Sequence, residues 1–167
     1  MKKSSKFAAG GGFRSALTVV LLTIAPTLAL ASQAGETAGS AAAVTAPKAP
    51  LYQELKGARL GMAAEEIHKF LGKPNEKDDA VEYFEFSNVE RARVYYGEDG
   101  KAEAIVATYI GSESKAPTPE AVLGSSIEFA PDGSGSRRID YPAFGYWVAY
   151  SRTAGEKPYT IITMKTL

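Results

Sequence analysis

The sequence has 167 residues, no cysteine, and 19 basic and 19 acidic side chains. The lack of cysteine excludes disulfides, thiolate metal sites, a cysteine nucleophile and a lipid anchor on cysteine. From Ser32 onward the chain carries 15 basic and 19 acidic residues, and this mildly acidic composition argues against nucleic-acid binding, which needs clustered Lys and Arg.

The N-terminus has the three-part pattern of a secretory signal. Residues 1–15 are basic, residues 16–30 form an apolar run interrupted only by threonine and proline, and Ala29 and Ala31 are the small residues that a signal peptidase recognises. A membrane anchor is the alternative, but about 15 apolar residues fall short of the roughly 20 that a span requires. We predict a signal peptide over residues 1–31, with Ala34 as the next candidate cleavage site, and a periplasmic or secreted protein without a stable membrane anchor.

Residues 32–50 are rich in Ala, Thr and Pro and have almost no large apolar side chains. Such a segment cannot bury enough surface to offset the entropy of ordering it. It is predicted to be a flexible linker, and the folded part is expected to begin near Leu51.

The clearest predicted helix covers residues 62–71. Ala63, Ile67, Phe70 and Leu71 have the spacing of one buried stripe, and Gly72 and Pro74 are typical of a helix end. Three predicted strands follow at residues 81–87, 89–97 and 102–110, each rich in β-branched and aromatic residues. Between the last two, Asp99-Gly100 predicts a two-residue hairpin turn, which would place Tyr96 opposite Glu103 and Val94 opposite Ile105.

A second unit follows with the same order of elements. Thr118-Pro119-Glu120 is a helix start, and Gly124 ends that helix after Leu123. Strands are predicted at residues 127–130 or 137–141, then at 145–151 and 159–165.

The two units can be aligned. Leu71-Gly72 matches Leu123-Gly124, Val94-Tyr95-Tyr96 matches Val148-Ala149-Tyr150, and Ala104-Ile105-Val106 matches Thr160-Ile161-Ile162. We predict an α+β fold of two diverged tandem units, residues 51–111 and 112–167, each a short helix plus an antiparallel meander, with the helices packed on one face of the sheet. An α+β sheet without duplication is the alternative.

One part of the first unit resembles a known signature. Leu60-Gly61-Met62, Glu66-Ile67 and Leu71-Gly72-Lys73-Pro74 are similar to the "GM…EV…LGxP" pattern of small exported domains, which include the BamE-like (SmpA/OmlA) lipoproteins and the tandem-repeat β-lactamase inhibitor proteins. The resemblance implies short helices packed on an antiparallel sheet that binds another protein. The chain departs from both groups because it has neither the lipid-attachment cysteine nor the disulfide bridges, and the second unit lacks the Gly-Met and Gly-x-Pro motifs.

No residue pattern indicates catalysis, a metal site or a cofactor. The single histidine, His68, is expected to be solvated on its helix, because one histidine cannot form a histidine metal site. Asp78, Asp79, Glu82 and Glu85 do not have the spacing of a calcium loop and are expected on solvated turns and strand edges. We therefore expect a non-catalytic protein.

Aromatic side chains are the remaining functional signal. Twelve of them lie on or beside predicted strands, and alternation along a strand directs about half of them away from the helices. Tyr, Trp and Arg are enriched in protein interfaces. We predict a sheet face that binds another envelope or secreted protein, with Arg91, Arg93, Tyr95, Tyr141 and Trp147 as binding residues. The alternatives are a protease or β-lactamase inhibitor, a small hydrolase whose site the sequence does not reveal, and a domain that binds a small apolar ligand.

Overall fold

The computed structural model describes residues 48–167. The predicted signal peptide and most of the predicted linker lie outside these residues. Within them, no helix has the length and hydrophobicity needed to cross a membrane.

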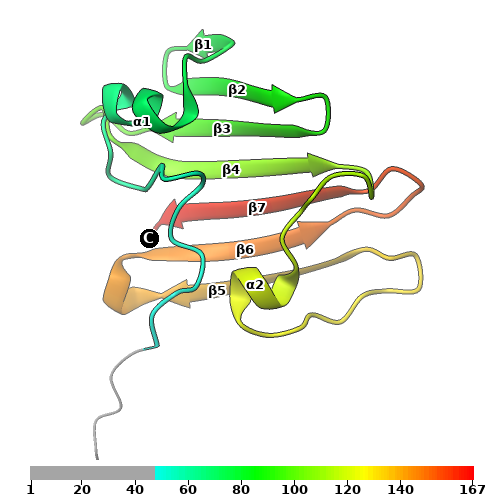
Figure 1. The fold of residues 1–167 in the computed structure, drawn as a ribbon. Helices are drawn as coiled ribbons and strands as arrows, with labels where there is room; N and C mark the ends of the chain where they lie inside the picture. Colours follow the sequence, from blue (N-terminus) through cyan, green and yellow to red (C-terminus); the bar gives the residue numbers. More distant parts are fainter. Residues whose placement is uncertain (1–47) are drawn as a thin grey trace, which may run out of the picture. The chain divides into compact units, whose positions relative to one another are not determined.

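Seven strands form one antiparallel sheet in the order β1-β2-β3-β4-β7-β6-β5 (Figure 1). They are β1 (Glu76–Asp78), β2 (Val81–Ser87), β3 (Glu90–Tyr96), β4 (Ala102–Ile110), β5 (Gly135–Tyr141), β6 (Tyr146–Arg152) and β7 (Tyr159–Thr166). Two short helices, α1 (Ala64–Leu71) and α2 (Pro119–Leu123), and a single 3₁₀ turn, η1 (Pro142–Phe144), complete the described part. The mixed α+β class with an antiparallel sheet is therefore confirmed.

Strand positions agree with the sequence in most cases. β2, β3, β4, β6 and β7 begin and end within one residue of their predicted limits. The choice left open in the second unit is resolved in favour of residues 135–141, because residues 127–130 form no strand. The short edge strand β1 was not predicted, since its three residues are all charged.

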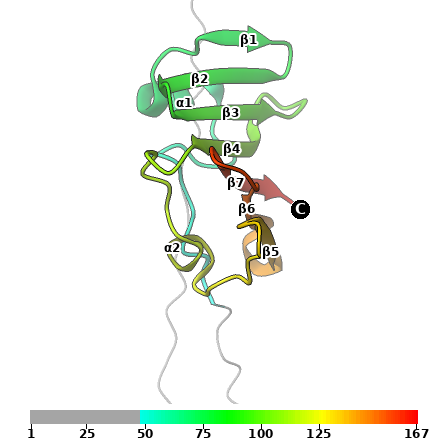
Figure 2. The ribbon, with the colours of Figure 1, turned by 90° about the vertical axis from the view of Figure 1, so that its right-hand side faces the viewer.

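The core lies between the sheet and the segments that cover one of its faces. Figure 2 shows α1, α2 and the residues just before α1 on the same side of the sheet. Alternate strand residues face this side, among them Val94, Ile105, Val148, Ile162 and Met164, each at most 1% exposed. They form one cluster with Ile67 and Leu71 of α1 and Val122 and Leu123 of α2.

Helix α1 begins at Ala64, two residues later than predicted. The carboxylate of Glu66 accepts a hydrogen bond from the backbone N–H of Ala63 at 3.2 Å, which is the half of a capping box that needs no side-chain acceptor at Ala63. Ile67 and Leu71 are buried as predicted, but the placement of Phe70 in the same stripe is wrong, because its side chain is 50% exposed. Its ring lies over Gly57, where there is no side chain to displace it.

The β3–β4 hairpin differs from the two-residue turn predicted for it. Tyr96 pairs with Ala102, not with Glu103, and the turn closes with Gly97 and Lys101 joined by a 2.9 Å backbone hydrogen bond. The loop therefore contains Glu98, Asp99 and Gly100. The register shifts between Tyr96 and Tyr95, so that Glu103 is an extra residue in β4. This bulge restores the predicted pairing of Val94 with Ile105.

Gly100 still requires a left-handed backbone, since its φ is 71°. A side chain there would contact nothing within 4 Å, so Gly100→Val tests conformation alone. We expect this variant to lower the free energy of unfolding by about 1 kcal/mol or more, because a β-branched residue resists positive φ. Gly100→Asn is the matched control and should lose less. Equal urea midpoints for Gly100→Val and the unchanged protein would show that position 100 does not need a left-handed backbone.

Candidate functional site

The candidate site is on the face of the sheet opposite the helices, which we call the outer face (Figure 2). Strand alternation places every second residue there. In β3, for example, Ala92 and Val94 are buried in the core while Arg91, Arg93 and Tyr95 are exposed. By the pairing register the outer face also carries Tyr83 and Glu85 of β2, Ala104, Val106 and Thr108 of β4, Thr163 and Lys165 of β7, Trp147 and Ala149 of β6, and Arg138 and Asp140 of β5.

The register places small side chains along the middle of the outer face and large ones at its sides. One row across the sheet runs Tyr83, Arg93, Val106, Thr163, Ala149, Arg138, and the next runs Val81, Tyr95, Ala104, Lys165, Trp147, Asp140. In the first row Arg93 and Arg138 stand on either side of smaller side chains, whereas in the second row Tyr95 and Trp147 flank Ala104 and the long side chain of Lys165. The smaller side chains of β4 and their neighbours between these walls form what we call the trough.

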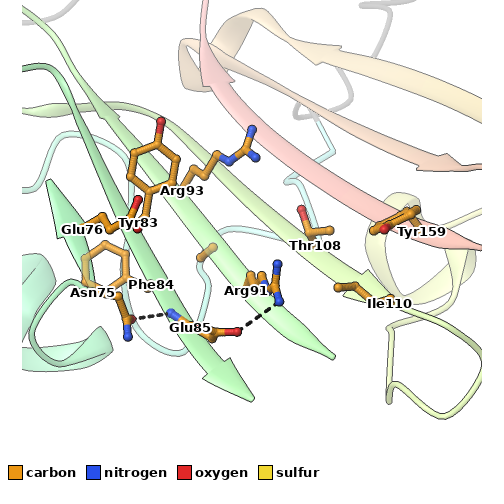
Figure 3. Close-up of a pocket in the computed structure, with 11 residues that line it drawn as sticks. Asn75, Glu76, Tyr83, Phe84, Glu85, Arg91, Arg93, Thr108, Ile110 and Tyr159 are labelled. Carbon is orange, nitrogen blue, oxygen red and sulfur yellow. Dashed lines mark hydrogen bonds and ion pairs between the residues drawn. The ribbon is translucent and has the colours of Figure 1, made fainter. Parts of the chain in front are cut away.

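A hollow of about 430 Å³ lies on one side of this trough. Figure 3 shows Arg91 and Arg93 of β3 on one wall, with Thr108 and Ile110 of β4 and Tyr159 of β7 across from them. Arg91 and Arg93 lie two residues apart on one strand, so their guanidinium groups point to the same side.

The two arginines differ in their partners. Arg91 forms an ion pair with Glu85 at 3.1 Å, and both side chains are about half exposed, 53% and 48%. An exposed pair of this kind adds little stability. Arg93 lies over the ring of Tyr83, 5.5 Å from its centroid, and has no ion pair with any carboxylate among residues 48–167. Arg93 can therefore accept a carboxylate from outside without breaking an internal pair.

A second hollow of about 370 Å³ lies on the same face. Tyr95, Val106, Thr163 and Lys165 contribute to its lining. The side chain of Tyr95 is 36% exposed at its rim. This hollow combines an aromatic wall with a largely apolar floor, one cation and one carboxylate, that of Glu103.

Trp147 stands on the far side of the trough. The guanidinium of Arg138 lies over its ring at 4.2 Å, and Asp140 fixes that guanidinium with an ion pair of 2.6 Å. The indole is half-buried and stacks against this guanidinium.

Tyr141 is not part of this surface. It packs against the core cluster, with its ring 6.0 Å from that of Tyr146. Trp147 pairs with Asp140, so the residue next to Asp140 faces the helices. The sequence analysis grouped Tyr141 with the other four by composition, whereas the register separates them.

A buried polar cluster joins α1 to the sheet, and the sequence analysis missed it. Glu82 in β2 is fully buried. Its carboxylate accepts hydrogen bonds from Nε2 of His68 at 2.8 Å and from the hydroxyl of Tyr96 at 2.7 Å, and it lies 3.1 Å from Nζ of Lys77. The expectation that Glu82 would be solvated is thus wrong, whereas His68 keeps 33% of its side chain exposed while it binds Glu82. Alternation was the available signal, since Glu82 is in phase with the core residue Phe84.

The cluster keeps Glu82 ionised. Burial alone would raise the pKa of its carboxyl, but the hydrogen bonds from Tyr96, His68 and Lys77 outweigh this and lower the pKa below 4.5. Burial and the nearby carboxylate raise the pKa of Tyr96, so that its hydroxyl remains a donor. Because these groups bind one another, the cluster fastens α1 to β2 and β3.

Metal chemistry finds no support in the geometry of the described part. Residues 48–167 bring no three His, Asp or Glu side chains into positions that could hold a metal ion.

Comparison with known proteins gives little further information. No protein-family model matches the chain, and no curated protein matches it. Among solved structures, the chain is similar to a DUF4309 family protein, YjgB, from Bacillus subtilis. The match has 13% identity and a TM-score of 0.43, and covers 63% of this chain and 78% of that one. The resemblance to BamE-like and inhibitor proteins stays a prediction from the sequence.

Proposed function

We propose that this chain is an exported, non-catalytic domain of the bacterial cell envelope that binds another protein on the outer face of its sheet. The observation that supports this most directly is the position of α1 and α2 (Figure 2). Both lie on the opposite side, so within residues 48–167 Arg91, Arg93, Tyr95 and Trp147 have no helix above them.

The chemistry of the trough suggests what the partner presents. Arg93 can take a carboxylate, while the hollow beside Tyr95 and Val106 can take an apolar side chain. The stack of Arg138 on Trp147 offers a broad surface that is both aromatic and cationic. Aromatic and arginine anchors of this kind dominate the energy of many protein interfaces.

Export is proposed from the N-terminal pattern. A basic segment, an apolar run and Ala29-Leu30-Ala31 precede the folded part. The partner is then a periplasmic or extracellular protein. An inhibitor of a protease or β-lactamase would use the same surface against an enzyme, and an assay of the captured partner distinguishes that case.

A duplication is part of the same proposal. The meanders β2-β3-β4 and β5-β6-β7 have the same order of strands, and each follows a helix that ends at a glycine with positive φ, 85° at Gly72 and 74° at Gly124. Val94 pairs with Ile105, and its counterpart Val148 pairs with Met164. Strand pairing therefore matches Ile105 with Met164, whereas the sequence alignment had matched it with Ile161 on the outer face.

Truncation of two side chains tests the binding face. We expect Tyr95→Ala and Trp147→Ala each to weaken capture of an envelope partner by about 2 kcal/mol, or roughly 30-fold in Kd, because these rings are anchors. Unfolding should change by about 1 kcal/mol at most, because Tyr95 is exposed and Trp147 loses a cation–π contact with the exposed Arg138. The measurements are a pull-down from envelope extract with the exported protein as bait, binding of the captured partner, and urea unfolding.

Two controls separate binding from folding. Phe70→Ala removes a ring that is 50% exposed on the helix-bearing side and should leave capture unchanged. Val94→Ala removes fully buried apolar atoms and should lower stability but not affinity. Unchanged affinity in both outer-face variants would reject this surface as the binding site.

A further inference from the structure

A third hollow lies on the helix-bearing side of the sheet, away from the outer face. It has a volume of about 380 Å³. Residues 111–118, which connect β4 to α2, form one wall with Ser112, Ser114 and Thr118. The ends of β6 and β7 form another, with Arg152 and Thr160. The volume falls within the range of small-ligand sites, about 300–1,000 Å³.

Arg152 is the unusual residue of this hollow. It ends β6 and, by alternation, faces the same side as the buried residues Val148 and Tyr150. Its Nε is buried and has no hydrogen-bond partner among residues 48–167, and its guanidinium has no ion pair with any carboxylate there. A buried donor without an acceptor is costly, and such a group calls for an explanation.

The other polar groups of the hollow are mainly hydroxyls. Thr118 Oγ1 accepts a hydrogen bond from the backbone of Ala121 at 3.3 Å, which leaves its proton available. Ser114 donates its proton to the carbonyl of Gly111 at 2.7 Å. Thr160 is 6% exposed. One acidic side chain, that of Glu120, also lines the hollow but is exposed to solvent.

We propose that this hollow binds a small oxyanion, a carboxylate or a phosphate, and that the guanidinium of Arg152 is its main ligand. A guanidinium presents parallel N–H donors that match two oxygens of either group. An oxyanion in the hollow would give the guanidinium of Arg152 the charge partner that residues 48–167 do not supply. The Thr118 hydroxyl can donate a further hydrogen bond. The site is independent of the outer face and of any protein bound there.

Ligand-dependent stability tests the site. Sodium phosphate and sodium acetate are each titrated against sodium chloride at constant ionic strength, and Tm is followed. At about ten times Kd, the binding anion is expected to raise Tm by about 5 °C above chloride. The Nε–H resonance of Arg152 should shift with the same saturation curve. The two arms distinguish a phosphate site from a carboxylate site.

Matched variants make the result specific. Arg152→Gln should abolish the Tm response, and Glu120→Gln should increase it by removing a nearby negative charge. Arg138→Gln removes an arginine of the outer face and should leave the response intact. The proposal is overturned if neither anion raises Tm above chloride in the unchanged protein, or if Arg152→Gln and Glu120→Gln respond just as the unchanged protein does. If Arg152→Gln does not fold, Arg152→Lys takes its place and should weaken the response, because an ammonium lacks the parallel donors of a guanidinium.

Discussion

Glu82→Ala is expected to lower the free energy of unfolding by about 3 kcal/mol at neutral pH. The carboxylate is fully buried and binds the Tyr96 hydroxyl, His68 and Lys77. Removing it leaves the Tyr96 hydroxyl without its acceptor and uncouples α1 from the sheet. Urea unfolding measures the loss. Lys77→Ala is the control and should cost less than about 1 kcal/mol, because the Lys77 side chain is 65% exposed.

The Glu82 carboxylate also makes the free energy of unfolding depend on pH, and it should fall in acid. The pKa of this carboxyl is lowered below 4.5 in the folded state. Its contribution to the free energy of unfolding is therefore complete above pH 4.5 and is lost as the pH falls through the pKa of the folded state. Glu82→Gln keeps the shape of the side chain and removes the charge. The stability difference between this variant and the unchanged protein should therefore shrink in acid. If the free energies of unfolding of Glu82→Gln and the unchanged protein differed by the same amount from neutral pH into strong acid, Glu82 would not be ionised in the folded protein.

Ile162→Ala should destabilise the protein by about 3 kcal/mol or more, whereas Ile161→Ala should cost about 1 kcal/mol. The two residues are adjacent in the interior strand β7 and lose the same atoms. Ile162 is 0% exposed in the core, so its truncation creates a cavity. Ile161 lies half-exposed on the outer face, where the space it leaves is open to water.

This pair also tests which face of the sheet is the core. Urea unfolding of both variants measures the difference directly. Similar losses would mean that the outer face is packed as tightly as the core, and the proposal of an open binding surface would fail. A larger loss for Ile161→Ala would reverse the two faces.

Local patterns in the sequence predict the strands well, because hydrophobic alternation records which side of a strand is buried. Ala92, Val94, Ile105 and Ala107 form the inner side of the central hairpin as their spacing predicts. The same alternation correctly places Arg91, Arg93 and Tyr95 outside. Pairing of Val94 with Ile105 was predicted for an incorrect turn, and it holds only because the bulge at Glu103 compensates for the longer loop.

Properties that depend on distant parts of the chain were not predictable in this way. Tyr141 was assigned by residue type, and its side is decided by its register with β6. Glu82 was judged by its charge, although its buried position is made tolerable by His68 and Tyr96, each 14 residues away. In the second meander Ile139 pairs with Val148 as Glu82 pairs with Val94 in the first. Because Ile139 is apolar, it needs no hydrogen-bond partners when it is buried.

The strand order has a consequence for when the sheet can form. All neighbours except β4 and β7 are consecutive strands, which can pair as local hairpins. Among the strands of residues 48–167, the junction of β4 with β7 is the one long-range closure, and β7 is synthesised after the other six. Until β7 arrives, the meander β2-β3-β4 and the hairpin β5-β6 each present an unpaired edge. The complete sheet can therefore form only after β7 has been synthesised. Until then the chain is incompletely folded, which is the condition that passage through a translocation pore requires.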